Sequence, residues 1–326
     1  MASFKIEGLV SGGLITNYYC TSKCRHCLYN CSQAWPKHYI SKDNALEIFQ
    51  FCMLHNCTSL HIGGGEPFLN KKSLLDVAEA AQKVGMHIEY VETNSSWYVN
   101  EGQACKILDK LLSFGITTLL ISISPFHLEY IPLKKVFGVM DACKKTGMGI
   151  FPWSASFLND FLQLDPNKTY SFSELEKIFG KTYISTISSK YWIHPGGRAL
   201  NYFFSDNLTL DELLEINSLG CKELVDTSHF HFDLYDNFIP GLCAGLSIRR
   251  KDLFKDIKHE KYPILSVLFN QGIRGLFEFA QKYGFNPQKN KKYGSKCTFC
   301  FEIRKFFIEE GKQFPELQPI FHYLLL

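Results

Sequence analysis

The chain has 326 residues, 46% of them hydrophobic, with a formal net charge of +3 and a pI of about 8.2. This length allows one large domain, alone or with a smaller one, and the near-neutral charge argues against the concentrated basic face of a nucleic-acid-binding protein. No run reaches the ~18 apolar residues of a membrane span, and residues 1–8 lack a signal-peptide core. We therefore expect a cytoplasmic protein without nucleic-acid or membrane partners, whose twelve cysteines serve metal or redox chemistry.

The first two thirds of the chain alternate between short β-rich runs and amphipathic helical runs. Strands are expected at residues 9–17, 59–63, 87–92, 117–124, 149–154 and 187–193, and helices at residues 42–55, 72–84, 101–114, 133–146 and 172–179. Ser171 followed by Glu174 predicts a capping box at the start of the last of these helices. Six strand–helix units predict an α/β fold with parallel strands, as an open sheet or an incomplete barrel, and function at the carboxyl ends of the strands.

The pattern changes after residue 196. Two short β-rich runs, 229–234 and 238–242, flank a turn at residues 235–237 and predict a hairpin. A helix is expected at 264–283 and a final helix at about 298–310. We therefore predict a first domain over residues 1–205 and a small hairpin-plus-helix extension over residues 206–326.

Three cysteines follow the first predicted strand as C-x₃-C-x₂-C: Cys20, Cys24 and Cys27. Thiolates are the usual ligands of iron–sulfur clusters, and three of them leave one iron of a cubane cluster open to a substrate or cofactor. A zinc site is the alternative, with His26 or Cys31 as the fourth ligand.

The segment Cys20-Thr21-Ser22-Lys23-Cys24-Arg25-His26-Cys27 resembles the radical S-adenosylmethionine (SAM) signature, and Gly63-Gly64-Gly65-Glu66-Pro67 resembles the glycine-glycine-glutamate motif of the same family. The resemblance covers about residues 9–200. It implies a partial (βα)₆ barrel in which Cys20, Cys24 and Cys27 hold a catalytic 4Fe–4S cluster. It also implies that SAM binds the open iron and that an electron from the cluster cleaves it to methionine and a 5′-deoxyadenosyl radical.

The resemblance further implies which residues hold SAM. Gly63, Gly64, Gly65 and Glu66 would face its methionine amino group, since glycines permit close backbone approach. Polar residues at the ends of later strands would contact its ribose and carboxylate, namely Asn94 with its neighbours Thr93 and Ser95, and Ser122 and Ser124.

Three further residues lie at or just after the ends of predicted strands and are candidates for the site. Arg198, in a Gly-Arg-Ala element that resembles one in several family members, could bind a carboxylate with its guanidinium fork. His127 could make a polar substrate contact, or be a structural histidine. Trp153 could line the substrate site, or be a core aromatic residue.

Four cysteines lie past residue 200: Cys221, Cys243, Cys297 and Cys300. The hairpin that ends at Cys243 resembles that of SPASM and twitch extensions, which hold auxiliary iron–sulfur clusters. The resemblance implies one auxiliary 4Fe–4S cluster on these four residues, and the alternative is a zinc site on the same four.

By this resemblance the protein is a peptide-modifying radical SAM enzyme that draws electrons from a donor such as flavodoxin or ferredoxin. Its reaction would be oxidation, cross-linking or epimerisation. Epimerases of this kind carry an extra cysteine beside the hairpin ligand, whereas Cys243 is followed here by Ala244 and Gly245, which favours oxidation or cross-linking. Two alternatives stay open: a dehydrogenase or mutase acting on a small molecule, and a non-catalytic iron–sulfur or zinc scaffold.

Overall fold

The structure is a computed structural model that describes residues 3–153, 155–204 and 207–325. The chain forms two compact units. Unit 1 comprises residues 1–11, 26–30 and 194–326, and unit 2 comprises residues 12–25 and 31–193. None of the helices formed by the described residues is long and apolar enough to cross a membrane.

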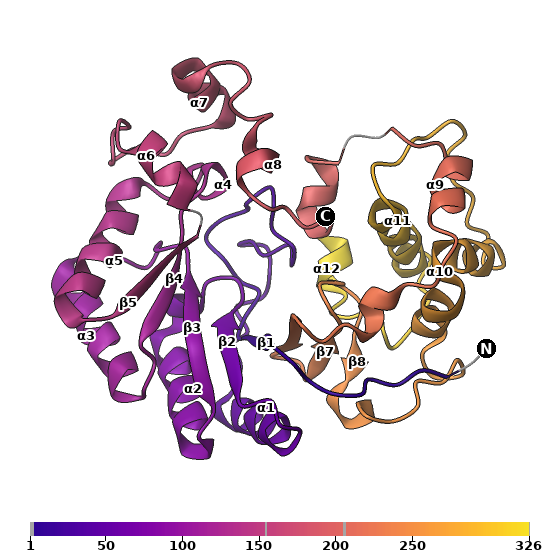
Figure 1. Cartoon of the computed structure of the whole chain (residues 1–326), viewed down its shortest axis with the longest axis horizontal. Coiled ribbons are helices and arrows are strands. Elements are labelled where there is room, and N and C mark those ends of the chain that lie inside the picture. Colours follow the sequence, from indigo (N-terminus) through magenta and orange to yellow (C-terminus); the bar gives the residue numbers. More distant parts are fainter. Residues whose placement is uncertain (1–2, 154, 205–206, 326) are drawn as a thin grey trace. The chain divides into compact units, whose positions relative to one another are not determined.

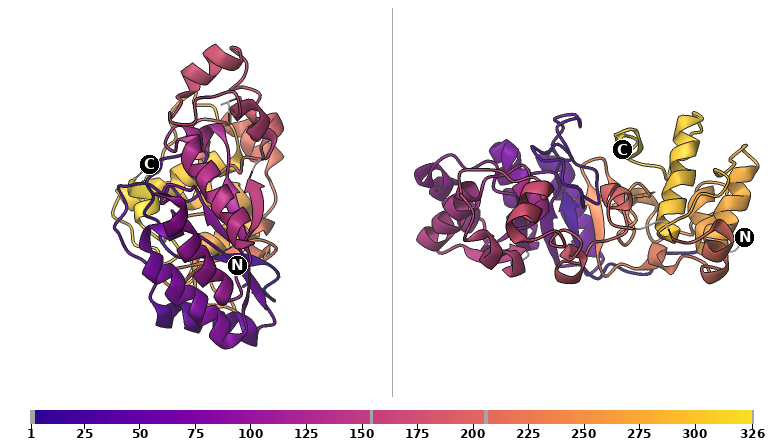
Figure 2. Two further views of the ribbon diagram at one scale, coloured as in Figure 1. Left: turned by 90° about the vertical axis from the view of Figure 1, so that its left-hand side faces the viewer. Right: turned by 90° about the horizontal axis from the view of Figure 1, so that it is seen from above.

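Unit 2 is built on parallel strands in the order β5-β4-β3-β2-β1. The strands are β1 (Gly12–Ile15), β2 (Ser59–Gly63), β3 (His87–Thr93), β4 (Thr118–Ser122) and β5 (Gly149–Trp153). The long helices between them are α1 (Lys42–Leu54), α2 (Lys71–Val84), α3 (Glu101–Ser113) and α5 (Leu133–Thr146), which follow one another around the outside of the sheet (Figure 1; Figure 2 shows two further views). The expected α/β class with an open parallel sheet is confirmed.

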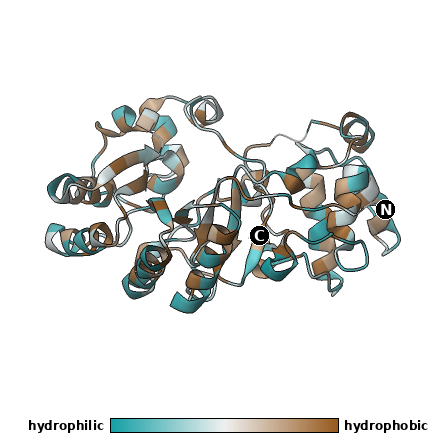
Figure 3. Cartoon of the chain, turned by 60° about the horizontal axis from the view of Figure 1, so that its bottom comes forward, coloured by the Kyte–Doolittle hydropathy of each residue, from teal (hydrophilic) through white to brown (hydrophobic). Residues whose placement is uncertain are grey.

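The long helices form because each has one apolar face and defined ends. In α2 the side chains of Leu74, Val77 and Ala81 are buried, Asn70 caps the start by accepting from the Ser73 backbone N–H, and Gly85 ends the helix at a φ of 73°. The hydropathy of the residues fits this arrangement. The strands are largely hydrophobic, whereas the helices carry both hydrophobic and hydrophilic residues (Figure 3).

Short helices complete unit 2. They are α4 (Pro125–Leu128), α6 (Leu158–Phe161), α7 (Phe172–Phe179) and α8 (Ile187–Lys190), with 3₁₀ turns η1 (Pro67–Asn70) and η2 (Ala155–Phe157). The capping box predicted for α7 is confirmed, because Ser171 and Glu174 exchange both of its hydrogen bonds.

The expected sixth strand, at residues 187–193, is wrong. The segment forms α8, and unit 2 has five parallel strands among its described residues. Ile187 and Tyr191 are buried while residues 188–190 are exposed, which is the spacing of a helical turn rather than the alternation of a strand. The hydroxyls of Ser185 and Ser189 each donate to a carbonyl three residues earlier, so they bond locally and not to a neighbouring strand. The predicted fifth strand ends at Ser154, which lies outside the described residues.

Unit 1 contains an antiparallel arrangement of β6 (Phe230–Asp233), β7 (Asn237–Ile239) and β8 (Ile248–Arg249). The predicted hairpin is confirmed as β6 and β7. Its turn forms because Asp233 Oδ1 accepts from the backbone N–H groups of Tyr235 and Asn237, at 2.9 and 3.0 Å, and Asp236 adopts a φ of 62°.

The helices of unit 1 are α9 (Leu210–Ile216), α10 (Pro263–Gln281), α11 (Lys296–Glu309) and α12 (Phe321–Leu324), with 3₁₀ turns η3 (Gly197–Asn201), η4 (Lys222–Val225) and η5 (Arg250–Asp252). Both predicted helices are confirmed as α10, which is kinked at Gly272, and α11, which begins two residues earlier than expected. That earlier start includes Cys297 in the helix. The predicted domain boundary, between residues 205 and 206, falls outside the described residues, so the division into 1–205 and 206–326 stays a prediction.

Candidate functional site

The glycine-glycine-glutamate turn follows β2 and packs on the chain that leaves β1. The backbone N–H of Gly65 donates to the Asn17 carbonyl at 2.7 Å, and that of Glu66 donates to the Tyr19 carbonyl at 3.2 Å. A Cβ atom on Gly65 would lie 2.1 Å from the Tyr19 carbonyl oxygen, and Gly64 has a φ of 143°. These glycines are therefore required by the contact between two backbone segments, one of which leads directly into Cys20.

The Glu66 carboxylate is fully buried and is bound by the end of β3. It accepts hydrogen bonds from the backbone N–H of Asn94 at 2.7 Å, from the Thr93 hydroxyl at 3.1 Å and from the backbone N–H of Phe68 at 3.1 Å. Burial raises the pKa of Glu66 to about 7, against the opposing effect of these bonds. Glu66 thus joins the ends of β2 and β3 within one buried network.

Asn94 connects this network to the first cysteine. Its side-chain Nδ2 donates to Cys20 Sγ at 3.3 Å, and the backbone N–H of Ser22 donates to the same sulfur at 3.4 Å. Asn94 and Cys20 are both buried. Two donors aimed at one buried sulfur favour a thiolate there, and donors of this kind tune a metal-bound thiolate.

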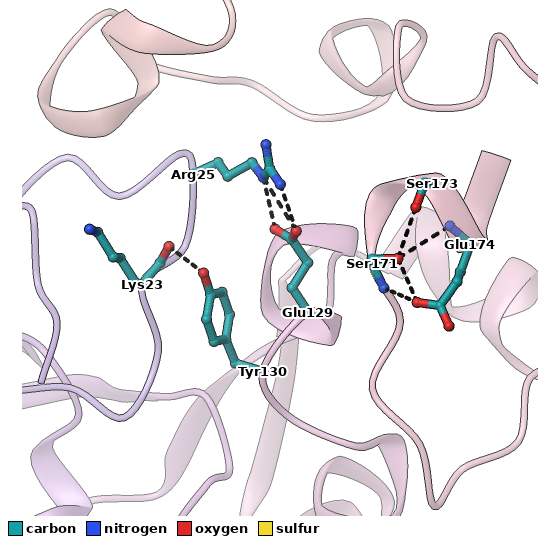
Figure 4. A network of polar contacts seen from close by, with 7 residues as sticks. All are labelled: Lys23, Arg25, Glu129, Tyr130, Ser171, Ser173 and Glu174. Carbon is teal, nitrogen blue, oxygen red and sulfur yellow. Dashed lines mark hydrogen bonds and ion pairs between the residues drawn. The ribbon is translucent and has the colours of Figure 1, made fainter.

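The loop that carries Cys24 is anchored through the residues beside it (Figure 4). Arg25 binds Glu129 through two guanidinium nitrogens at 3.0–3.3 Å and lies 4.5 Å from the ring centre of Phe172. The hydroxyl of Tyr130 donates to the Lys23 carbonyl at 3.0 Å. Because Arg25 contacts the Glu129 carboxylate through two nitrogens, this ion pair fixes the orientation of the loop in addition to holding it against Glu129.

Cys27 belongs to unit 1, whereas Cys20 and Cys24 belong to unit 2. The Cys27 carbonyl accepts from the backbone N–H of Arg198 at 3.1 Å, and a Cβ atom on Gly197 would lie 2.3 Å from that carbonyl oxygen. The Gly-Arg-Ala element, with Arg198 buried, therefore packs directly on the backbone of the third cysteine.

The remaining candidates of unit 2 lie at the ends of β4 and β5. Ser122 pairs with Trp153 across these two strands. Ser124 and His127 are linked by a hydrogen bond of 2.7 Å between Oγ and Nδ1, and burial lowers the pKa of His127 to about 4. The imidazole is therefore neutral at physiological pH. Trp153 donates its indole N–H to the Tyr191 hydroxyl.

The four C-terminal cysteines line one cavity of about 550 Å³ within unit 1. Cys221 precedes η4, Cys243 follows the hairpin, and Cys297 and Cys300 lie in the first turns of α11. The burial of these groups raises the pKa of Cys243 to about 12 and that of Cys297 to about 11. The bare thiols of Cys243 and Cys297 are therefore neutral, so a bound metal would have to displace their protons.

Two cavity residues of this site were missed by the sequence reasoning. Glu223 accepts from the Cys221 thiol at 3.0 Å and pairs with Lys296 at 2.6 Å, and Arg304 lines the same cavity. Arg304 could have been found from its spacing, because Cys297, Cys300 and Arg304 recur at i, i+3 and i+7 and so share one helix face.

A family model described as a 4Fe–4S single cluster domain matches residues 11–112. This segment includes the three-cysteine motif, the glycine-glycine-glutamate motif and Asn94. The match confirms the iron–sulfur domain that the cysteine spacing predicted. No curated protein sequence matches the chain.

Several solved structures resemble the chain at low sequence identity. Native anSMEcpe with bound AdoMet is 13% identical with a TM-score of 0.44, over 92% of this chain and 97% of that protein. The same protein with AdoMet and the Kp18Cys peptide gives a TM-score of 0.45 at 13% identity over the same shares. SuiB from Streptococcus suis, bound to the precursor peptide SuiA, is 13% identical with a TM-score of 0.32, over 72% of this chain and 59% of SuiB.

Proposed function

We propose that this chain, a radical SAM enzyme by its motif set and its 4Fe–4S domain, abstracts a hydrogen atom from a peptide and oxidises or cross-links it. The observation that carries the proposal is the buried network from Glu66 through Asn94 to Cys20 Sγ. It joins the glycine-glycine-glutamate motif, the end of β3 and the first cysteine, which are the parts that cluster and SAM binding require together.

In the proposed catalytic site, Cys20, Cys24 and Cys27 hold the 4Fe–4S cluster. If SAM is bound there, the reduced cluster would supply the one electron that cleaves SAM to methionine and a 5′-deoxyadenosyl radical. The donors on Cys20 Sγ and the anchored Arg25 loop support this site, since they hold buried sulfur ligands in place.

SAM itself would be held by residues from the strand ends. The proposed contacts are the backbone groups of the glycine-glycine-glutamate turn, Asn94, and the polar or charged side chains of Ser122, Ser124 and Arg198. The neutral imidazole of His127 would orient Ser124 rather than transfer protons, because its pKa lies well below physiological pH.

The second proposed cluster is an auxiliary 4Fe–4S cluster on Cys221, Cys243, Cys297 and Cys300. Four thiols around one cavity fit a closed cluster, which has no iron open to SAM. Such a cluster would take up the electron that a substrate radical must lose when it is oxidised. Without it, the proposal of an oxidative reaction on a peptide would lose its electron acceptor.

The core proposal is tested by measuring 5′-deoxyadenosine after anaerobic cluster reconstitution, with dithionite as reductant and SAM as substrate. We expect release by the native protein and none by the Cys20→Ala, Cys24→Ala, Cys27→Ala triple variant. A matched control replaces three cysteines outside the proposed sites, Cys52, Cys105 and Cys143, with alanine and should keep the activity. Release by the first triple variant, or none by native protein that holds iron, would refute the proposal.

The substrate class needs a separate test. Peptides encoded beside the gene are incubated with the reduced enzyme and SAM, with a flavodoxin or ferredoxin as electron donor, and analysed by mass spectrometry. Loss of two hydrogen atoms from a peptide supports oxidation or cross-linking. An unchanged mass together with an inverted residue would instead indicate epimerisation.

A further inference from the structure

Arg304 is a buried cation whose described hydrogen-bond partners are all neutral. Its side chain lies on α11, and the residue is 6% exposed. One guanidinium nitrogen, Nη1, donates to the Ala244 carbonyl at 3.0 Å and to the Tyr323 hydroxyl at 2.9 Å, and Nε donates to the Cys300 carbonyl at 3.4 Å. These bonds fix the position of the guanidinium but leave its charge uncompensated.

No carboxylate of the described residues forms an ion pair with Arg304. Glu223, which lines the same cavity, is already paired with Lys296 at 2.6 Å. The rings of Phe301 and Tyr323, each 5.6 Å from the guanidinium carbon, offer only a weak attraction. Burying a charge costs free energy unless an opposite charge lies nearby. We therefore expect an anion to bind beside Arg304.

The auxiliary cluster proposed for the same cavity would be this anion. Cys297, Cys300 and Arg304 lie on one face of α11, and all three line the cavity together with Cys221 and Cys243. An iron–sulfur cluster with four thiolate ligands carries net negative charge, and each added electron makes it more negative. The cavity thus places one buried positive charge beside a group whose charge changes on reduction.

We propose that Arg304 is the counter-charge of the auxiliary cluster and raises its reduction potential. The inference rests on the proposed function, because it requires that Cys221, Cys243, Cys297 and Cys300 hold the cluster. A fixed cation stabilises the reduced cluster more than the oxidised one, since the attraction grows with the negative charge. Arg304 therefore favours the direction of electron flow that an acceptor of substrate electrons requires.

The experiment is an EPR-monitored redox titration of the auxiliary cluster in the full chain that carries the Cys20→Ala, Cys24→Ala, Cys27→Ala changes. Arg304→Gln removes the charge and Arg304→Lys keeps it. Arg274→Gln removes the same charge from an exposed position on α10 and is the matched control. Iron content and the cluster spectrum are measured for every variant before titration.

We expect Arg304→Gln to make reduction at least about tenfold less favourable, a downward shift of about 59 mV for one electron. In Arg304→Lys and Arg274→Gln, the reduction potential of the auxiliary cluster should change by less than about a third of that shift. If Arg304→Gln assembles no cluster, assembly by Arg304→Lys still supports the need for a positive charge. An unshifted Arg304→Gln, or equal shifts in the glutamine and lysine variants, would overturn the inference while leaving the cluster assignment intact. Absence of iron in the starting triple variant would refute the assignment itself.

Discussion

Replacing Glu66 with alanine tests whether its carboxylate joins the two strand ends. The change removes the acceptor for three buried donors, the backbone N–H groups of Phe68 and Asn94 and the hydroxyl of Thr93. Each buried donor left without an acceptor costs about 1–3 kcal/mol, and the Thr93 hydroxyl can rotate toward another partner. We therefore expect the free energy of unfolding to fall by about 2–6 kcal/mol, mainly from the two backbone N–H groups, which is a large part of the stability of a typical domain.

The assay is urea unfolding at pH 7.5 under anaerobic conditions, followed by circular dichroism. Glu79→Ala is the control, because Glu79 forms an exposed ion pair with Lys42 on the helical surface, and its loss should cost at most about 1 kcal/mol. A Glu66→Ala loss below about 1 kcal/mol would refute the reasoning. A variant of full stability whose affinity for SAM is lost would instead place the carboxylate directly on the cofactor.

The other predictions concern a glycine and a second buried carboxyl group. Gly65→Ala should lower both stability and 5′-deoxyadenosine release, because its Cβ would lie 2.1 Å from the Tyr19 carbonyl oxygen; Gly8→Ala, with open space around it, is the control and should change neither quantity. Burial raises the pKa of Glu316, which accepts from the backbone N–H of Ile264 at 2.7 Å, from 4.5 to about 7. Because the folded state favours the protonated form, this group's contribution to stability is fully present below pH 4.5 and falls by about 3 kcal/mol as the pH rises through 7. We therefore expect the free energy of unfolding of Glu316→Gln, measured with urea, to rise relative to that of the native protein between pH 5 and pH 8. If the two free energies change in parallel with pH across that range, the raised pKa of Glu316 is contradicted.

Features that depend on neighbours in the chain could be predicted from the sequence. The strand–helix alternation, the capping box at Ser171 and the hairpin turn at Asp236 all depend on the local order of residues, and each is present in the structure. The three-cysteine motif also lies within eight residues, and its spacing alone indicated iron–sulfur chemistry, which the matched domain bears out. The strand predicted at residues 187–193 is wrong. Its buried residues Ile187 and Tyr191 are four positions apart, and that spacing places two side chains on one face of a strand and also on one face of a helix.

Only the tertiary structure decided which distant groups meet. Cys221 and Cys300 are separated by almost eighty residues, and their common cavity follows from how η4, the hairpin and α11 pack within unit 1. The bond from Asn94 to Cys20 Sγ likewise depends on β3 and the chain after β1 reaching the same end of the parallel sheet. Arg304 carries no motif, and only folding buries it beside the thiols, where no carboxylate of the described residues forms an ion pair with it. Spacing along the chain can nominate ligands, but the charge and hydrogen bonds around them are set by residues that folding brings from elsewhere.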